Sequence, residues 1–273
     1  MPNAEVLLPP PLAGFVGSDL AADLLATGLV DGPAGSLLLD IGTNTEIALW
    51  DGSVLHITSV PGGPAFEGGG VRRGMPAEQG AIWRVRPETT GGFLCQVIGG
   101  GEARGYCGSG LVDAVAVLLA SGRLKPSGRF AAAPGPDGFA LQADNAGSSI
   151  TGGDIDAFQR AKAAMAAAAT VLLARARLSW SDLRRICVCG AFGRTLDIEH
   201  SQQVGLLPPV PPGCIELHGD ATLAGCERVL LAGNGSELLA APAANLTAVN
   251  MSLAPEYDDL YIDHLRLRPI PTE

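Results

Sequence analysis

The sequence predicts an α/β fold built on a mixed β-sheet. Three antiparallel strands are expected between residues 36 and 60, because apolar runs alternate there with turn residues. Further along the chain, helical patterns alternate with short apolar strands, which is the arrangement of α/β proteins. The composition agrees, since 273 residues with 47% hydrophobic and 17% charged side chains suffice for a large folded core.

The first half of the chain begins with a proline-rich stretch, residues 1–17. A short helix is expected at Asp19–Thr27, with Ser18 as its cap and Gly28 as its stop. The Asp51-Gly52 pair is a hairpin signal between two apolar runs. The strands expected in this half are Ser36–Asp40, Glu46–Trp50, Val54–Val60 and Phe93–Ile98.

Two glycine-rich loops separate these elements. The first, Pro61–Gly80, carries Glu67 and the Arg72-Arg73 pair, and the second starts at Gly99. A loop as long as the first is usually functional when it lies inside a compact domain.

Helices and strands alternate in the second half of the chain. Residues 126–149 read as an irregular, exposed insertion, and the sequence leaves open whether the end of the chain, Tyr257–Leu267, is helix or strand. The expected helices are Ser109–Gly122, Ile155 to about Arg177, Ile198–Val204 and Thr222–Ala232. The expected strands are Ile186–Cys189, Ile215–His218 and Leu246–Leu253.

Charge and apolar pattern exclude several classes of function. The net charge of −10 argues against broad binding to nucleic-acid phosphates. No apolar run approaches the roughly 18–20 residues of a membrane span, and no signal peptide precedes the chain's first strand. A cytoplasmic location is therefore expected.

The six cysteines show no spacing typical of a zinc ribbon or an iron–sulfur cluster, and the four histidines show no metal-ligand spacing. We interpret the cysteines as small buried hydrophobes in a reducing compartment. A redox or cluster role for Cys107 stays open as the alternative, because it lies at a predicted helix start, where a thiol pKa is lowered.

The first motif with chemical potential runs from Asp40 to Glu46. Gly42 is expected to allow a positive φ and a close approach of phosphate, and Thr43, Asn44 and Thr45 supply hydrogen-bond donors. Asp40, at the strand end, can hold a hydrated Mg²⁺. An ordinary hairpin is the alternative. The tip resembles the phosphate hairpin of the superfamily of acetate and sugar kinases, heat-shock chaperones and actin.

Two further motifs follow the first in order. Gly108, Ser109 and Gly110 open a helix whose first free amides form an anion site, unless Ser109 is only its cap. The strand Ile186–Cys189 is followed by a turn of mostly small residues that would let a flat ring approach the backbone. These residues are Gly190, Ala191, Phe192 and Gly193. The alternative is that they form only a tight connection between the strand and the next helix. We expect the three motifs to face one cleft from three sides.

Taken together, six segments resemble the C-terminal ATPase region of reductive activators of corrinoid-dependent enzymes, of the RACo and RamA type, over about residues 8–250. They are Asp40–Leu49, Gly63–Met75, Tyr106–Asp113, Ile150–Ala164, Cys189–Asp197 and Val204–Pro208. The resemblance implies a ribonuclease-H-like, actin-like ATPase fold. The expected divisions are an extension at 1–35, an ATPase-type domain of one or two lobes at 36–250, and a C-terminal segment at 251–273.

The resemblance also implies a function. Such a chain would bind ATP and Mg²⁺ and help return a Co(II) corrinoid protein of a methyltransferase system to Co(I). Its expected partners are that corrinoid protein, a ferredoxin-like electron donor and a second copy of the chain. Phosphate would lie at 42–45, residues 108–110 would line the same cleft, and adenosine would lie at 190–193. Asp40 and Glu46 are the candidates for positioning Mg²⁺ or water, with Glu67 a weaker one.

The sequence departs from full-length members of this family. It contains neither the ferredoxin-like domain nor a second phosphate hairpin, so Asp40–Glu46 would be the second hairpin of the pair. A fragment, a stand-alone remnant and one piece of a split activator all stay open. The alternative functions are a non-catalytic docking or dimerisation module, and a small-molecule kinase of the same superfamily.

Overall fold

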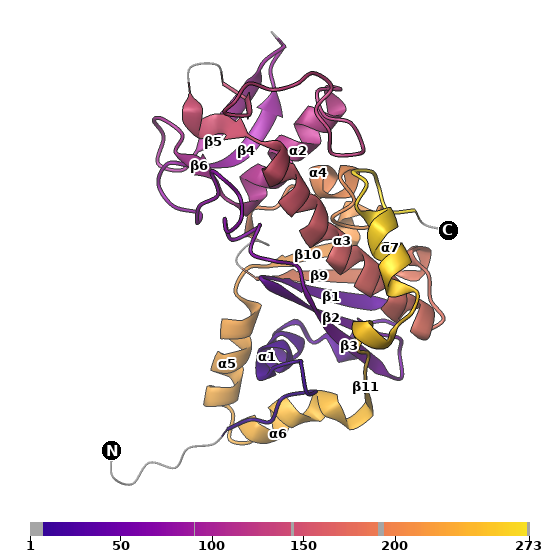
Figure 1. Cartoon of the computed structure of the whole chain (residues 1–273). Helices are drawn as coiled ribbons and strands as arrows, with labels where there is room; N and C mark the ends of the chain where they lie inside the picture. The colour runs from indigo at the N-terminus through magenta and orange to yellow at the C-terminus, as the bar shows by residue number, and fades with distance from the viewer. Residues whose placement is uncertain (1–7, 90, 143–144, 191–193, 272–273) are drawn as a thin grey trace.

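A six-stranded mixed sheet forms the centre of the molecule (Figure 1). The computed structural model describes residues 8–89, 91–142, 145–190 and 194–271. The strand order is β10-β9-β1-β2-β3-β11. The strands are β1 (Ser36–Ile41), β2 (Asn44–Trp50), β3 (Leu55–Pro61), β9 (Arg185–Cys189), β10 (Ile215–His218) and β11 (Leu246–Ala248).

The pairing of these strands confirms the predicted mixed sheet. β1, β2 and β3 are antiparallel neighbours, as the hairpin signals indicated. β9 pairs parallel to β1, β10 pairs parallel to β9, and β11 pairs parallel to β3. Because β1 and β9 run parallel, their carboxyl ends meet at one edge of the sheet.

A smaller lobe lies beyond that edge (Figure 1). Its three-stranded sheet has the order β5-β4-β6 and packs on helix α2. Its elements are β4 (Ala81–Pro87), β5 (Phe93–Val97), β6 (Gly105–Tyr106) and α2 (Gly108–Ala120). β4 was not predicted from the sequence, because Trp83 and Arg84 interrupt its apolar pattern at the point where the register with β5 shifts.

Helices cover both faces of the large sheet. On one face lies α3 (Gly152–Arg175), with α7 (Tyr257–His264) packed against it. On the other face lies α1 (Ser18–Thr27), flanked by α5 (Ala221–Leu231) and α6 (Gly235–Ala240) (Figure 1). α4 (Ile198–Gln203) instead packs against α2.

The covered faces explain why β1 reads as a continuous apolar run. Leu37 and Leu39 point into the larger hydrophobic core, which includes α2 and α3, whereas Leu38 points into the second core under α1. Successive side chains of a strand alternate between its faces, so a strand buried on both sides must be apolar throughout. Asp40 breaks this run at the strand's carboxyl end.

Most predicted elements are present, with shifts of up to three residues at their ends. The strand predicted at Leu246–Leu253 is wrong in its second half, because β11 ends at Ala248 and Met251–Leu253 form a 3-10 helix. The helix α6 was missed, and the chain's end is helical at α7. Ser18 is the first residue of α1 and forms no capping bond, so its predicted role as the cap is wrong. The described parts of the segment 126–149, which leave out 143–144, consist largely of turns and bends and contain β7 (Phe139–Ala140), which pairs with β8 (Ser149–Ile150).

Of the six free cysteines, four are buried, whereas Cys214 is half-buried and Cys226 is exposed. Within the described residues, no helix is both long enough and apolar enough to cross a bilayer.

Asp154 ties the long glycine-rich loop to the start of α3. Its Oδ2 accepts hydrogen bonds from the backbone nitrogen of Thr151, at 2.7 Å, and from the Thr151 hydroxyl, at 2.9 Å. Its Oδ1 accepts a bond of 2.6 Å from the backbone nitrogen of Arg72. Because Asp154 is 2% exposed, water cannot replace these bonds. One carboxylate therefore caps α3 and orders the loop that follows β3.

We expect Asp154→Asn to destabilise the protein by about 1–3 kcal/mol. An amide has one acceptor oxygen, and its nitrogen would face a backbone N–H that needs an acceptor. The matched control is Asp156→Asn on the same helix, since Asp156 is exposed and pairs with Arg160 four residues on. We expect this control to cost about 0.5 kcal/mol or less. Urea unfolding measures both, and equal effects would contradict this role of Asp154.

Candidate functional site

A cleft of about 450 Å³ lies where the large sheet meets the smaller lobe. Its walls come from the β1–β2 hairpin, the loop after β3, the start of α2 and the chain after β9. The lining residues are Asp40, Ile41, Gly42, Phe66, Glu67, Met75, Pro76, Ala77, Cys107, Gly108, Ser109, Gly190 and Thr195. Six residues of the predicted motifs are among them, from all three motifs, so the expected cleft is present.

The floor of the cleft is formed by the ends of two parallel strands. Asp40 ends the apolar run of β1, and Gly190 follows β9. Gly190 has φ +88°, and a Cβ atom there would lie 3.0 Å from Oδ1 of Asp40. Only glycine fits this position without strain. Ala191, Phe192 and Gly193, the rest of the predicted adenosine motif, lie outside the described residues.

The hairpin tip is linked to the loop after β3. The Thr43 hydroxyl donates a hydrogen bond of 3.0 Å to Oε1 of Glu67, and the backbone nitrogen of Gly63 donates one of 2.9 Å to the Thr43 carbonyl. Gly42 does not have a positive φ, so that part of its prediction is wrong. Its need for glycine is spatial, because a Cβ atom would lie 3.1 Å from the carbonyl of Asn44.

Thr43 is exposed at the hairpin tip, and neither it nor the remaining predicted residues of the hairpin are among those that line the cleft. Asn44 is exposed at the start of β2, and Thr45 is 2% exposed in the core. Glu46 lies opposite Asp40 across the β1–β2 pair and accepts a bond of 2.8 Å from the Ser59 hydroxyl. Burial raises the pKa of Glu46, with the nearby acidic groups adding to the shift.

A second carboxyl group, which was not predicted from the sequence, lies behind Asp40. Asp23 of α1 is fully buried, hydrogen-bonds to Asp40 and accepts a bond of 2.8 Å from the Thr222 hydroxyl of α5. Burial, then the charge of Asp40, raises the pKa of Asp23. Burial also raises the pKa of Asp40, against the hydrogen bond from Asp23. A protonated Asp23 thus leaves one negative charge, on Asp40, at the cleft floor.

That charge suits a hydrated divalent cation. Mg²⁺ keeps several waters and binds through one or two carboxylates together with phosphate oxygens. Asp40 lines the cleft beside the bare backbone of Gly190, which leaves room for those waters. No lysine or arginine is among the described residues that line the cleft. An anion there would depend on backbone amides, hydroxyls and its own cation.

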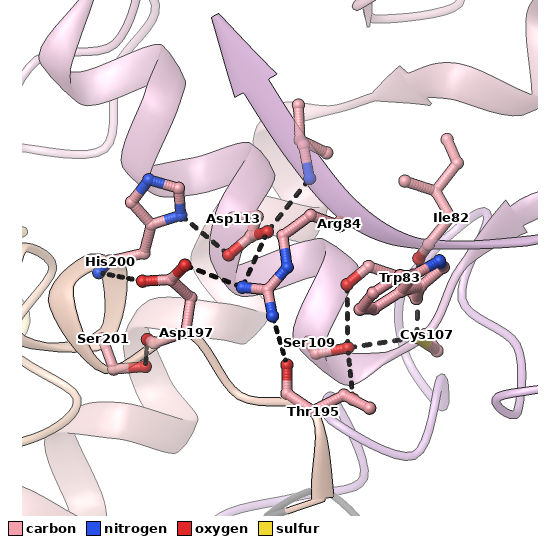
Figure 2. Close-up of polar contacts among 11 residues, drawn as sticks. Ile82, Trp83, Arg84, Cys107, Ser109, Asp113, Thr195, Asp197, His200 and Ser201 are labelled. Atoms are coloured by element: carbon pink, nitrogen blue, oxygen red, sulfur yellow. Dashed lines mark hydrogen bonds and ion pairs between the residues drawn. The ribbon is translucent and has the colours of Figure 1, made fainter. Parts of the chain in front are cut away.

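The start of α2 forms the opposite wall (Figure 2). The Ser109 hydroxyl donates a bond of 3.0 Å to the Trp83 carbonyl and accepts one of 3.0 Å from the Thr195 hydroxyl. The first amides of a helix lack partners within it and carry partial positive charge, which favours anions. Gly110 does not line the cleft: a Cβ atom there would lie 1.9 Å from the Ile82 carbonyl, so it lets α2 pack tightly on β4.

Behind this wall lies a cluster of four ionisable side chains from three elements (Figure 2). Asp113 of α2 is fully buried and accepts bonds from the backbone nitrogen of Val85, at 3.0 Å, and from Nδ1 of His200, at 2.8 Å. Arg84 of β4 lies 2.8 Å from Asp197 and 3.5 Å from Asp113. Asp197 also caps α4 by accepting a bond of 3.1 Å from the His200 nitrogen.

Two groups of side chains in the described residues could in principle hold a metal ion, Cys187 with Glu216 and His218, and Asp113 with Asp197 and His200. In each, an arginine already binds a carboxylate at 2.8 Å. A guanidinium thus supplies the positive charge that a cation would bring.

The comparisons with known proteins agree on one family. The model of the "C-terminal domain of RACo the ASKHA domain" matches residues 34–272. The corrinoid activation enzyme RamQ of Eubacterium limosum is 32% identical over 96% of this chain and 47% of its own length. The reductase of the Co(II) methylated amine-specific corrinoid protein of Methanosarcina barkeri is 27% identical over 96% of this chain and 52% of its own length.

A solved structure, the reductive activator for the corrinoid, iron–sulfur protein, superposes with a TM-score of 0.87 and 32% identity. The match covers 95% of this chain and 44% of that one. This chain therefore spans about half the length of the relatives it matches.

His200 generates a prediction about pH. Its hydrogen bond to Asp113 raises its pKa, against burial and with the charges of Asp113 and Asp197 adding to the rise. A raised pKa means that the folded protein holds this proton more tightly than the unfolded chain does. The stabilisation is therefore full below about pH 6.5 and is lost as pH rises through the folded pKa.

We expect His200→Gln to destabilise the protein more at about pH 5.5 than at about pH 9. Urea unfolding of both proteins at the two pH values measures this difference. Comparing variant with wild type at each pH removes the titration of Asp23 and Asp40, which the two proteins share. An equal loss at both pH values would mean that His200 carries no stabilising charge.

Proposed function

Because this chain belongs to the family of the C-terminal ASKHA domain of RACo, we propose that it is the ATP-binding module of a reductive activator. In this proposal it helps return a Co(II) corrinoid protein of a methyltransferase system to Co(I). The names of the relatives support the corrinoid protein as the partner, and an ASKHA domain implies nucleotide binding.

The observation that carries the proposal is the meeting of the three motifs at one cleft. Asp40, Ser109 and Gly190 come from chain positions far apart and line the same space of about 450 Å³. In our assignment, the hairpin tip and the start of α2 bind the phosphates. The bare backbone at Gly190 lies beside the nucleoside. Bound Mg²⁺ would neutralise phosphate charge next to Asp40.

The proposed residue roles follow from position. Asp40 holds Mg²⁺ through its water shell, and Glu67 at the cleft rim, hydrogen-bonded to Thr43, orients water near the phosphates. Glu46 acts at longer range, because it lies beside Asp40 on the neighbouring strand. Thr45, Asn44 and Gly110 support the walls from outside the cleft.

Reduction of Co(II) corrinoid is uphill for ordinary donors, and in this proposal ATP supplies the free energy through a conformational step. A ferredoxin-like domain or protein donates the electron, and the working unit is a homodimer. The divisions 1–35, 36–250 and 251–273 stay a proposal too. In the structure, α1 packs against α5, and α7 packs against α3.

The second candidate function is a docking or dimerisation module without catalysis. The observation in its favour is that the described residues contain one six-stranded sheet with one phosphate hairpin. Such a module would bind the corrinoid protein equally well with and without nucleotide. The activator would bind it with a nucleotide-dependent affinity, so a pull-down with and without Mg-ATP separates the two.

We expect the wild-type chain to bind Mg-ATP and Gly42→Arg to abolish binding. Any side chain at Gly42 starts 3.1 Å from a backbone carbonyl and 3.6 Å from Glu67, and an arginine would fill the cleft. The control is Gly213→Arg, because a Cβ atom there meets nothing within 4 Å and the residue precedes β10 at its end remote from the cleft. Isothermal titration calorimetry provides the affinity.

Asp40→Asn completes this experiment. We expect it to weaken binding of Mg-ATP more than binding of ATP in the presence of EDTA, since the carboxylate acts through the cation. Nucleotide binding that survives Gly42→Arg in a folded protein would exclude this cleft as the site. Binding with no Mg²⁺ dependence would exclude Asp40 as the metal residue.

A further inference from the structure

We propose that Arg84 is a positioning residue for the cleft, which holds the hydroxyl pair of Ser109 and Thr195 on the cleft wall by joining the smaller lobe to the segment before α4. The inference rests on the proposed function for its nucleotide readout. Its structural part stands on the contacts of Arg84 alone.

Arg84 binds two groups on the segment before α4 (Figure 2). Its Nη1 lies 2.8 Å from Oδ2 of Asp197, and its Nη2 donates a bond of 3.0 Å to the carbonyl of Thr195. The side chain of Arg84 is 12% exposed and its bond to Asp197 is half-buried, whereas its bond to the Thr195 carbonyl is exposed at the surface. The guanidinium therefore fixes the main chain at Thr195 relative to β4.

Asp113 anchors this guanidinium from the other side. It is fully buried, lies 3.5 Å from Nη1 of Arg84 and receives two further bonds, from Val85 and His200. Asp113 and Asp197 bring two carboxylates into a half-buried space, and the Arg84 guanidinium lies within 3.5 Å of both. Buried charges are tolerated when they are paired in this way. Loss of the arginine charge leaves both carboxylates poorly compensated.

The network ends at the cleft. Thr195 is held by its carbonyl to Arg84, and its hydroxyl donates a bond of 3.0 Å to the Ser109 hydroxyl. Ser109 in turn donates to the carbonyl of Trp83, at 3.0 Å. Ser109 and Thr195 both line the cleft. Two consecutive residues of β4 thus hold both members of the hydroxyl pair.

An irregularity in β4 makes this arrangement possible. The register between β4 and β5 shifts between Ile82 and Arg84, and consecutive residues of a regular strand point to opposite faces. A bulge changes the direction of a side chain locally and is common next to active sites. Here the Arg84 guanidinium lies over the Trp83 ring, with its carbon 5.3 Å from the ring centroid.

The geometry requires a planar fork. Arg84 reaches an acid and a carbonyl in different directions from one rigid group, which a lysine ammonium cannot reproduce. A ligand that touches Ser109 or Thr195 therefore acts on both the smaller lobe and α4 at once. In this proposal, the network couples binding in the cleft to the positions of the smaller lobe and α4.

The test compares Arg84→Lys with Arg86→Lys, which lies two residues along the same strand and is exposed. The first readout is hydrogen–deuterium exchange without nucleotide. We expect Arg84→Lys to raise exchange in residues 194–203 and at the start of α2 by about tenfold, with Arg86→Lys unchanged. The second readout is Mg-ATP affinity far below the melting temperature, which we expect to fall about tenfold in Arg84→Lys alone.

Thr195→Val is the second variant, because it keeps the shape of the side chain and removes only the hydroxyl that reaches Ser109. We expect weaker Mg-ATP binding with normal exchange in α4. If Arg84→Lys does not fold, the Mg-ATP affinity of Thr195→Val tests the proposal.

The proposal is overturned if folded Arg84→Lys matches Arg86→Lys in exchange. It is also overturned if Thr195→Val, or folded Arg84→Lys, binds Mg-ATP like the wild type. If the wild type itself binds no nucleotide, the proposed function fails, and the exchange result alone decides the role of Arg84.

Discussion

The burial of β1 on both faces is the constraint on which the site depends. Leu37 and Leu39 are committed to one core and Leu38 to the other, so the strand has one acceptable register. A slip by one residue would exchange the two faces of the strand. The same register brings Asp40 to the end of the strand, level with the end of β9, where Gly190 opens the backbone. The apolar packing of the sheet therefore positions the polar floor of the cleft.

The parts of the site that the sequence predicts are local. The hairpin at 40–46 and the glycine-rich start of α2 are each formed by residues that are neighbours in the sequence, so turn and helix-start patterns predict them. Residues assembled from distant segments were missed. Asp23 reaches Asp40 from α1, and Arg84 meets Asp113 and Asp197 from two other elements. The hydrophobic periodicity of a single sequence does not indicate which distant residues come into contact.

The errors also have physical reasons. β4 was missed because the half-buried Trp83 and Arg84 break the alternation that marks a strand. Gly42 was expected to have a left-handed backbone, whereas the hairpin turns without one and requires a small residue beside the Asn44 carbonyl. Gly110 was predicted to line the cleft because Gly108 and Ser109 precede it, but its backbone faces β4. A glycine in a motif can therefore serve packing between elements as well as a ligand.

The bond between Asp154 and the backbone of Arg72 bears on the free energy that binding in the cleft would require. The loop after β3 supplies Phe66, Glu67 and the segment 75–77 to the cleft rim, and this bond fastens it to α3 without any ligand. Ordering a free loop costs roughly 1–2 kcal/mol for each residue. Here that entropy is lost when the chain folds. A molecule that enters the cleft would therefore meet a rim that is already shaped, and would not have to supply the free energy of ordering this loop.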